Sequence, residues 1–170
     1  VSTPGLEGKV NISVKAVDRV GGVSEYSYSY MSDTTSPSNI SANVDLSGET
    51  KDGHVFYNSI PTISLSAVDG GIGIAEYRLY GSREESNTSG VFTLGTGKYY
   101  ISVVDRLGNE SERIPVSQLL GLASNTFVVD TDAPAISINK PDDSSSNGWY
   151  GGDIDLTVLS QDNIGLDNIK

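Results

Sequence analysis

The stretch Tyr99-Tyr100-Ile101-Ser102-Val103-Val104-Asp105-Arg106-Leu107-Gly108-Asn109 decides the fold. Side chains at alternate positions of a strand point to opposite faces, and here both faces are largely apolar. Such a strand is typical of the middle of a sheet. The Gly108-Asn109 pair that follows tolerates the positive φ angles of a tight hairpin turn. The stretch therefore predicts a central β-strand that ends in a turn.

The end of this stretch occurs twice. Val17-Asp18-Arg19-Val20-Gly21-Gly22 repeats the phrase that begins at Val104, so that Asp18 and Asp105 are 87 residues apart. Each copy is followed by Asp-Thr-x-x-Pro, at 33–37 and at 130–134, and these two linkers are 97 residues apart. A period near 90 residues matches a β-sandwich domain and is too long for a solenoid turn. The fold class expected is all-β, as tandem sandwiches.

Three segments follow from these spacings. Residues 1–34 are expected to be the C-terminal strands of a preceding repeat, residues 35–131 a complete repeat (the central repeat), and residues 132–170 the N-terminal strands of a following one. Two or three isolated strands are marginally stable in water, so the end segments need partners. The chain is expected to be a window on a longer array. Head-to-tail polymerisation, with each end completing its neighbour, is the alternative.

Alternating patterns predict the individual strands. They fall at residues 10–16, 26–30, 40–46, 63–67, 75–79, 91–94, 99–104, 127–129 and 154–156. The interval between the two shared motifs grows by ten residues in the central repeat, around 118–126, where residues 116–122 predict a short helical turn. We expect this insertion at an exposed tip, either as a partner-binding loop or as a neutral elongation. Tyr26, Tyr28, Tyr30 and Trp149 are expected to form a strand face and a core anchor, or else a sugar-stacking surface.

Composition excludes several classes of protein. The net charge is −11 and the pI about 4.3, which argues against binding nucleic acid. The chain has no cysteine, so neither disulfides nor thiolate metal sites are expected. Its apolar runs are too short to insert into a membrane. Acidic side chains are expected mostly on a solvated exterior, and they are also compatible with divalent cations.

The motifs together resemble the bacterial Ig-like repeats of surface adhesins and multi-domain secreted proteins. They comprise the Asp33-Thr34-Thr35-Ser36-Pro37 and Asp130-Thr131-Asp132-Ala133-Pro134 linkers, Gly148-Trp149-Tyr150, Asp162-Asn163-Ile164-Gly165 and Asp105-Arg106-Leu107-Gly108-Asn109. The resemblance implies immunoglobulin-like sandwiches and an extracellular or cell-surface location. This chain departs from the family pattern at Gly22 and at Gly70-Gly71, where asparagine is usual. The family implies no single ligand.

Sandwich topology predicts a metal site. Asp69, Asp105 and Asp33 belong to two loops and a linker that share the entry pole of the domain. Carboxylates about 5 Å apart repel by roughly 3 kcal/mol at an effective dielectric near 20, unless a cation offsets the repulsion. Calcium accepts six to eight oxygen ligands in flexible geometry and is the candidate cofactor. Asp130, Asp132 and Asp162 form a second candidate set. Solvated turn aspartates are the alternative for both sets.

Catalytic residues are not evident. His54 lies in a polar turn without a nucleophile at motif spacing, and no enzyme is expected. The favoured function is a structural or adhesive spacer repeat of a bacterial surface or extracellular fibrous protein. An accessory carbohydrate-binding module of a secreted polysaccharide-active enzyme is the alternative. Expected partners are neighbouring repeats of the same chain, together with a host or polysaccharide ligand.

Overall fold

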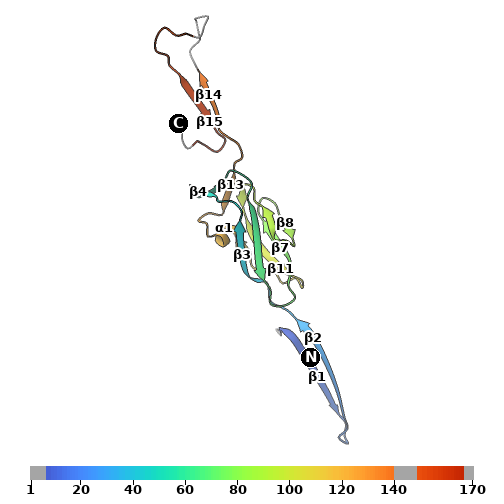
Figure 1. Ribbon diagram of the computed structural model, residues 1–170. Helices are drawn as coiled ribbons and strands as arrows, with labels where there is room; N and C mark the ends of the chain where they lie inside the picture. Colours follow the sequence, from blue (N-terminus) through green and yellow to red (C-terminus); the bar gives the residue numbers. More distant parts are fainter. Residues whose placement is uncertain (1–6, 140–148, 167–170) are drawn as a thin grey trace. The chain divides into compact units, whose positions relative to one another are not determined.

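The protein is almost entirely β-structure. The computed structural model describes residues 7–139 and 149–166, and all its regular elements there are strands except one short helix. The chain divides into two compact units, Val1–Val129 and Asp130–Lys170. The first unit contains β1 to β13 and α1, and the second contains β14 and β15 (Figure 1). The predicted all-β class is confirmed.

A long hairpin opens the first unit. β1 (Gly8–Val17) pairs antiparallel with β2 (Val23–Ser32) along its whole length. The two strands join through a turn built on Asp18, whose Oδ1 accepts the backbone N–H groups of Val20 at 2.9 Å and Gly22 at 2.7 Å. The alternation places Val10, Ile12, Val14 and the three tyrosines of β2 on one face of the hairpin, as the sequence predicted, whereas Val17, Val23 and Met31 lie on the other face.

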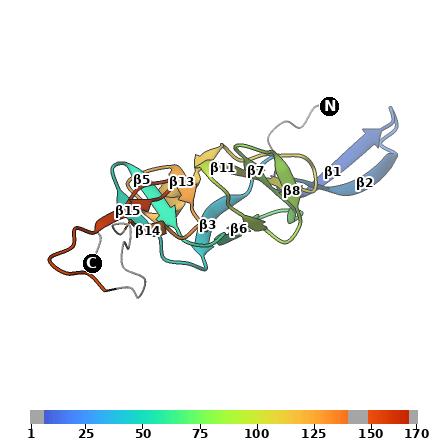
Figure 2. The ribbon, with the colours of Figure 1, turned by 90° about the horizontal axis from the view of Figure 1, so that it is seen from above.

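The central repeat contains three sheets. The first has the order β3-β6-β9 and the second the order β12-β11-β7-β8, so β11 lies inside its sheet as predicted. Figure 2 shows these two groups of strands on opposite sides of the repeat. A third sheet, β10-β13-β5-β4, includes a parallel pair between β13 and β5. The strands are β3 (Ser38–Val44), β4 (Glu49–Lys51), β5 (His54–Tyr57), β6 (Thr62–Val68), β7 (Ile74–Tyr80), β8 (Glu85–Asn87), β9 (Val91–Thr93), β10 (Gly97–Lys98), β11 (Tyr100–Asp105), β12 (Ile114–Pro115) and β13 (Thr126–Val129).

One apolar core holds these sheets together. Most of its buried members come from alternate positions of the predicted strands, as expected for sheets packed face to face. Val55 and Tyr57 come from β5, which was not predicted, and Val116 comes from α1. Aromatic rings concentrate near β13, where Phe127 lies 6.2 Å from the ring of Tyr57 and 6.0 Å from that of Tyr99. The buried members are Val55, Tyr57, Ile63, Leu65, Tyr77, Leu79, Phe92, Leu94, Tyr99, Ile101, Val103, Val116 and Phe127.

The ten-residue insertion is not an exposed tip. The predicted helical turn is present as α1 (Val116–Leu120), which runs into the insertion. Within the insertion, Leu119, Leu120 and Leu122 pack against the core. Gly121 ends the helix in the left-handed conformation, with φ 66°. The side chain of Asn125 holds the segment after the helix in place, because it accepts a hydrogen bond from Ser117 N and donates one to Tyr99 O. The prediction of an exposed tip was therefore wrong, because the leucines of the insertion are partly buried against the core.

The second unit contains one described hairpin, β14 (Ala135–Asn139) paired with β15 (Thr157–Gln161). The strand predicted at 154–156 was wrong, because β15 begins at Thr157. Trp149 is 80% exposed, which contradicts its prediction as a core anchor. Gly148 of the Gly-Trp-Tyr phrase lies outside the described residues. In the first unit, His54 is half-buried at the start of β5, where its ring lies 5.9 Å from Phe56, and not in an exposed turn.

A polar network covers the outer face of β7 and β11. Glu110 accepts hydrogen bonds from Ser102 at 2.5 Å and from Tyr80 and Arg78 at 2.8 Å. The pKa of Glu110 lies below its ordinary value, mainly because the Ser102 hydroxyl donates to the carboxylate. Burial acts in the opposite direction and raises the pKa, whereas Tyr80, Arg78 and Arg113 lower it further.

A depressed carboxyl pKa makes stability depend on pH in one direction. The contribution of Glu110 is complete above the pKa of the unfolded chain and is lost as the pH falls through the lower folded-state pKa. In Glu110→Gln, the free energy of unfolding is therefore expected to fall less steeply than in the wild type as the pH drops from about 5 to about 3. Urea unfolding at a series of pH values measures this. Glu112→Gln serves as the matched control, and an equal slope in wild type and Glu110→Gln would contradict the assignment.

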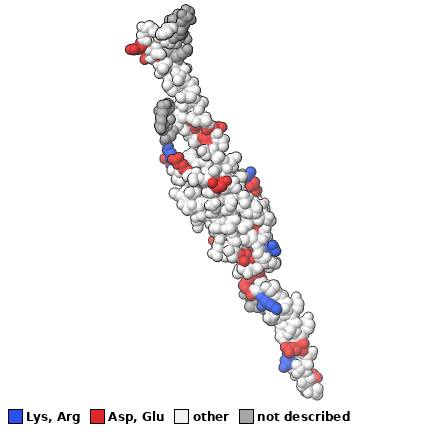
Figure 3. All heavy atoms as spheres, viewed as in Figure 1, with Lys and Arg blue, Asp and Glu red and all other residues white. Residues whose placement is uncertain are grey.

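The surface of the described residues carries mixed charge. Figure 3 shows acidic and basic side chains interspersed on the visible face, without a large basic patch there. Within the described part of the chain, no helix is long and apolar enough to cross a membrane.

Candidate metal site at the entry pole of the central repeat

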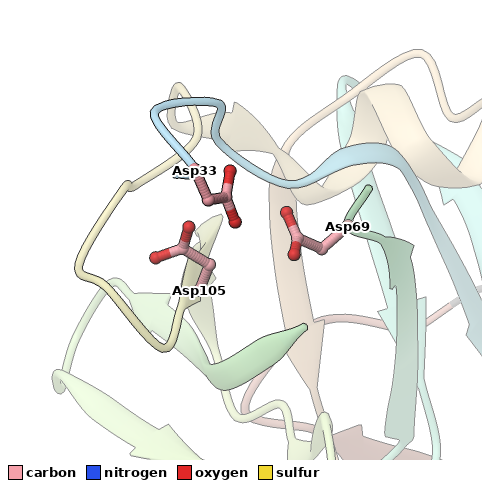
Figure 4. Close-up of side chains that lie close together, drawn as sticks. All are labelled: Asp33, Asp69 and Asp105. Carbon is pink, nitrogen blue, oxygen red and sulfur yellow. The ribbon is translucent and has the colours of Figure 1, made fainter. Parts of the chain in front are cut away.

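Three aspartates predicted from the sequence lie together. Asp33 belongs to the linker before β3, Asp69 follows β6, and Asp105 ends β11. Each offers a carboxylate oxygen within 4.8 Å of the other two. Figure 4 shows the three carboxylates pointing toward one another. Sandwich topology brings them together because the loops after β6 and β11 lie at the pole where the linker enters.

Asp105 is the most buried of the three, with 1% of its surface exposed. Its Oδ1 accepts the backbone N–H groups of Leu107 and Asn109, both at 2.8 Å, and its Oδ2 accepts the Asn109 side chain at 2.6 Å. Burial alone would raise the pKa of Asp105. Donors from Asn109, Leu107 and Gly108 outweigh burial and lower the pKa of Asp105 below its ordinary value. This carboxylate is therefore held in its charged form.

Asp69 has one satisfied oxygen and one unsatisfied oxygen. Its Oδ2 accepts the N–H groups of Gly71 at 3.2 Å and Gly73 at 2.6 Å. Its Oδ1 is buried and has no hydrogen-bond partner. Leaving a buried acceptor of this kind unpaired is costly, so such an atom in a folded protein calls for a specific explanation.

Asp33 ties the linker to both loops. Its Oδ2 accepts Ile72 N at 2.9 Å, and its Oδ1 accepts both the N–H and the hydroxyl of Thr35. Its backbone carbonyl accepts the side chain of Asn109 at 3.3 Å. Sequence reasoning assigned Asn109 to the hairpin turn and missed this second role. The repeated motif gave no signal for this role, because the first copy has Gly22 at the equivalent position.

This arrangement suits a divalent cation. The cluster brings together three carboxylates, and one of them contributes a buried oxygen that receives no donor from the protein. Each carboxylate oxygen has about two acceptor positions, so the oxygens that already accept N–H groups can still bind a cation. Carboxylate and carbonyl oxygens are the ligands that hard cations prefer. The trio Asp33, Asp69 and Asp105 could therefore hold a metal ion.

The second predicted set of metal ligands, Asp130, Asp132 and Asp162, does not converge in the same way. Asp130 Oδ1 accepts Asp132 N at 3.1 Å, and Asp162 Oδ1 accepts the N–H groups of Ile164 and Gly165 at 2.9 Å. Asn163 donates to Asp132 at 3.4 Å. Among the described residues, Asp33, Asp69 and Asp105 meet the geometric test for a metal-binding group, whereas Asp130, Asp132 and Asp162 do not. Asp18, the counterpart of Asp105 in the first motif, lies in the hairpin turn.

Gly71 provides a sharp test of this geometry. A Cβ atom at Gly71 would lie 1.9 Å from Asp33 Oδ2, whereas a Cβ atom at Gly70 would meet nothing within 4 Å. Gly71→Ala is therefore expected to displace the Asp33 carboxylate and weaken divalent-cation affinity about tenfold or more, since that is the typical effect of disturbing a ligand's support. Gly70→Ala is the matched control. Calorimetric titration with calcium measures both, and equal affinities would contradict the placement of Asp33.

Comparison with known proteins identified no relative: no protein-family model, no curated protein and no solved structure matches the chain.

Proposed function

We propose that the chain is a non-catalytic spacer from a tandem array of immunoglobulin-like repeats, and that calcium bound by Asp33, Asp69 and Asp105 fixes the linker into the central repeat. The buried, unpartnered Oδ1 of Asp69 carries this proposal. A cation at that position satisfies this oxygen and joins the linker to two loops of the following repeat. A spacer with a fixed linker angle transmits orientation along an array.

Two features support the immunoglobulin-like assignment. The strand orders β3-β6-β9 and β12-β11-β7-β8 resemble the two sheets of such a sandwich, with β9 returning to the first sheet between β8 and β11. The turns at Asp18 and Asp105 are also built alike: in each, one carboxylate oxygen accepts the N–H groups two and four residues onward. Equivalent hydrogen bonds in the two copies favour equivalent places in two repeats.

The location we propose is extracellular, on a bacterial cell surface. Calcium-binding modules in extracellular proteins typically have dissociation constants of about 10⁻⁴ to 10⁻³ M, which suits a partly exposed site with few protein ligands. The proposed partners are neighbouring repeats of the same chain. The carboxylates at the entry pole accept hydrogen bonds from the backbone N–H groups of their own loops. Their proposed role is therefore to stabilise the junction, and it requires no substrate.

A carbohydrate-binding module is the second candidate. Tyr26 and Tyr28 are 70% and 56% exposed on one face of β2, and the ring of Tyr28 stacks on that of Tyr30 at 6.3 Å. Aromatic rings of this kind can stack on sugars. Binding of the chain to a glycan array, lost in Tyr26→Ala, would favour this candidate over the spacer.

Spin-label distances test the spacer proposal. The chain has no cysteine, so Ser27→Cys on β2 and Ser86→Cys on β8 can be labelled selectively. Calcium is expected to narrow the distribution of distances between the two labels, because it fixes the linker. Asp69→Asn should abolish the narrowing. A distribution that is the same in calcium and in chelator would contradict the proposal.

A further inference from the structure

A cleft lies beside the linker that enters the central repeat. It has a volume of about 590 Å³, and its walls come from the ends of β1 and β2 and from the loops after β6 and β11, all within the first unit. Ligand pockets of proteins typically have volumes of about 300–1,000 Å³. The cleft is therefore large enough to accommodate a side chain of a partner molecule.

Three apolar side chains, Met31, Ile72 and Leu107, form the apolar wall of this cleft. They come from different elements, since Met31 lies on β2, Ile72 follows β6 and Leu107 follows β11. Their exposed fractions are 74%, 44% and 58%. Single exposed apolar residues are common on proteins, whereas several that gather around one cleft indicate a binding surface.

The charged side chains that line the cleft are acidic. Glu7 and Asp33 contribute carboxylates, and no lysine or arginine of the described chain belongs to the lining. Asp69 and Asp105 offer oxygens within 4.8 Å of Asp33 and add to the negative potential there. A cleft lined by charges of one sign concentrates their field and attracts ligands of the opposite sign.

Glu7 is held in place and keeps one oxygen for a ligand. Its Oε1 accepts hydrogen bonds from the backbone N–H of Thr34 at 2.9 Å and from the Thr34 hydroxyl. Its Oε2 accepts none from the described residues. A carboxylate that is already fixed loses little conformational freedom when it binds a cation.

An apolar wall beside carboxylates suits one kind of side chain. Arginine and lysine lay their methylene stems along apolar surface and keep the charged end in polar surroundings. Arginine fits better, because its guanidinium binds carboxylates through two N–H groups and is less strongly hydrated than an ammonium. A metal ion alone would not use the apolar wall, and a neutral sugar would leave the carboxylates without a cation. The net charge of −11 also favours a basic partner.

We propose that the cleft binds an arginine side chain from a basic segment of a partner protein, with the guanidinium against Glu7 and Asp33 and the stem against the apolar wall. This inference goes beyond the spacer function and does not require a bound calcium ion. Asp33 serves the linker through its hydrogen bonds and the partner through its charge.

A peptide titration tests the proposal. The probe is acetyl-Leu-Arg-Leu-amide, and acetyl-Leu-Gln-Leu-amide is the control without the charge. Both are followed by NMR of the ¹⁵N-labelled chain in chelator, so that no calcium occupies Asp33. The arginine peptide should shift the amide signals of Ile72 and Leu107. It should also bind about tenfold more tightly than the glutamine peptide, the typical effect of hydrogen bonds to a charged group.

Glu7→Gln tests the role of the carboxylate. The affinity for the arginine peptide should fall about fivefold, the upper end of the range for a solvent-exposed ion pair. Glu112→Gln is the matched control, because Glu112 is exposed and does not line the cleft. That variant should bind the peptide like the wild type.

Leu107→Ser tests the apolar wall. The affinity for the arginine peptide should fall about tenfold, because the stem loses the largest part of its apolar cover on one side. Val20→Ser is the matched control, since Val20 is the counterpart of Leu107 in the first motif, is 92% exposed and lies outside the cleft. This control should keep the wild-type affinity.

Absence of peptide binding, equal affinity for the two peptides, or equal effects of Leu107→Ser and Val20→Ser would overturn the proposal. A wild-type mass of twice 18.0 kDa that Leu107→Ser returns to 18.0 kDa would assign the cleft to a second copy of the chain instead. A glycan that shifts the same amide signals in place of the peptide would also contradict the proposal. Because chelator is present throughout, none of these outcomes bears on the proposed calcium site, which the titrations with calcium test separately.

Discussion

Phe127→Ala is expected to lower the free energy of unfolding of the central repeat by about 3–5 kcal/mol, the range for removing a buried aromatic ring. Phe127 is fully buried in β13, the last strand before the second linker. Its ring contacts those of Tyr57 and Tyr99, so truncation leaves a cavity and also removes two aromatic pairs.

Urea denaturation followed by tyrosine fluorescence measures this loss. Val91→Ala is the control, because Val91 is 45% exposed on β9 and its truncation should change stability by no more than about 0.5 kcal/mol. A cost for Phe127→Ala as small as that of Val91→Ala would mean that β13 does not belong to the core.

Asp69→Asn is expected to abolish the stabilisation of the central repeat by calcium. Calcium at a hundred times its dissociation constant should stabilise the wild type by about 2.7 kcal/mol, because it binds the folded state. The variant removes one of three negative charges and the buried oxygen without a donor. Thermal unfolding in calcium and in chelator measures the difference.

Asp52→Asn provides the matched control for Asp69→Asn. Asp52 is exposed in the turn between β4 and β5 and has φ 50°, a conformation that asparagine tolerates. This variant should keep the full response to calcium. An equal response in wild type and Asp69→Asn would place the cation elsewhere or exclude it.

The sequence predicted the strands that carry regular alternation. β1, β2, β3, β6, β7, β9, β11 and β13 were predicted because apolar and polar side chains alternate along them, even on β1, where Val10 alone is buried. The strands β4, β5, β8, β10, β12 and β14 were missed, since segments of two to five residues show little or no period. α1 was predicted as a short turn but placed at a surface tip, because its sequence does not show that Val116 enters the core.

The candidate site was predicted in part. The repeated motifs placed Asp33, Asp69 and Asp105 at one pole, and the structure brings their oxygens within 4.8 Å. Sequence could not show that Asp69 Oδ1 is buried and unpartnered, because this depends on which of the two carboxylate oxygens accepts the N–H groups of Gly71 and Gly73. Nor could it show the close approach of Gly71 to Asp33, which depends on the path of the linker.

Calorimetric titration of the chain with calcium tests the central claim most directly. The account predicts one bound calcium at the site of Asp33, Asp69 and Asp105, with this binding lost in Asp69→Asn and retained in Asp52→Asn. The absence of binding, or the same binding in the Asp69→Asn background, would contradict the assignment of Asp33, Asp69 and Asp105 as a calcium site.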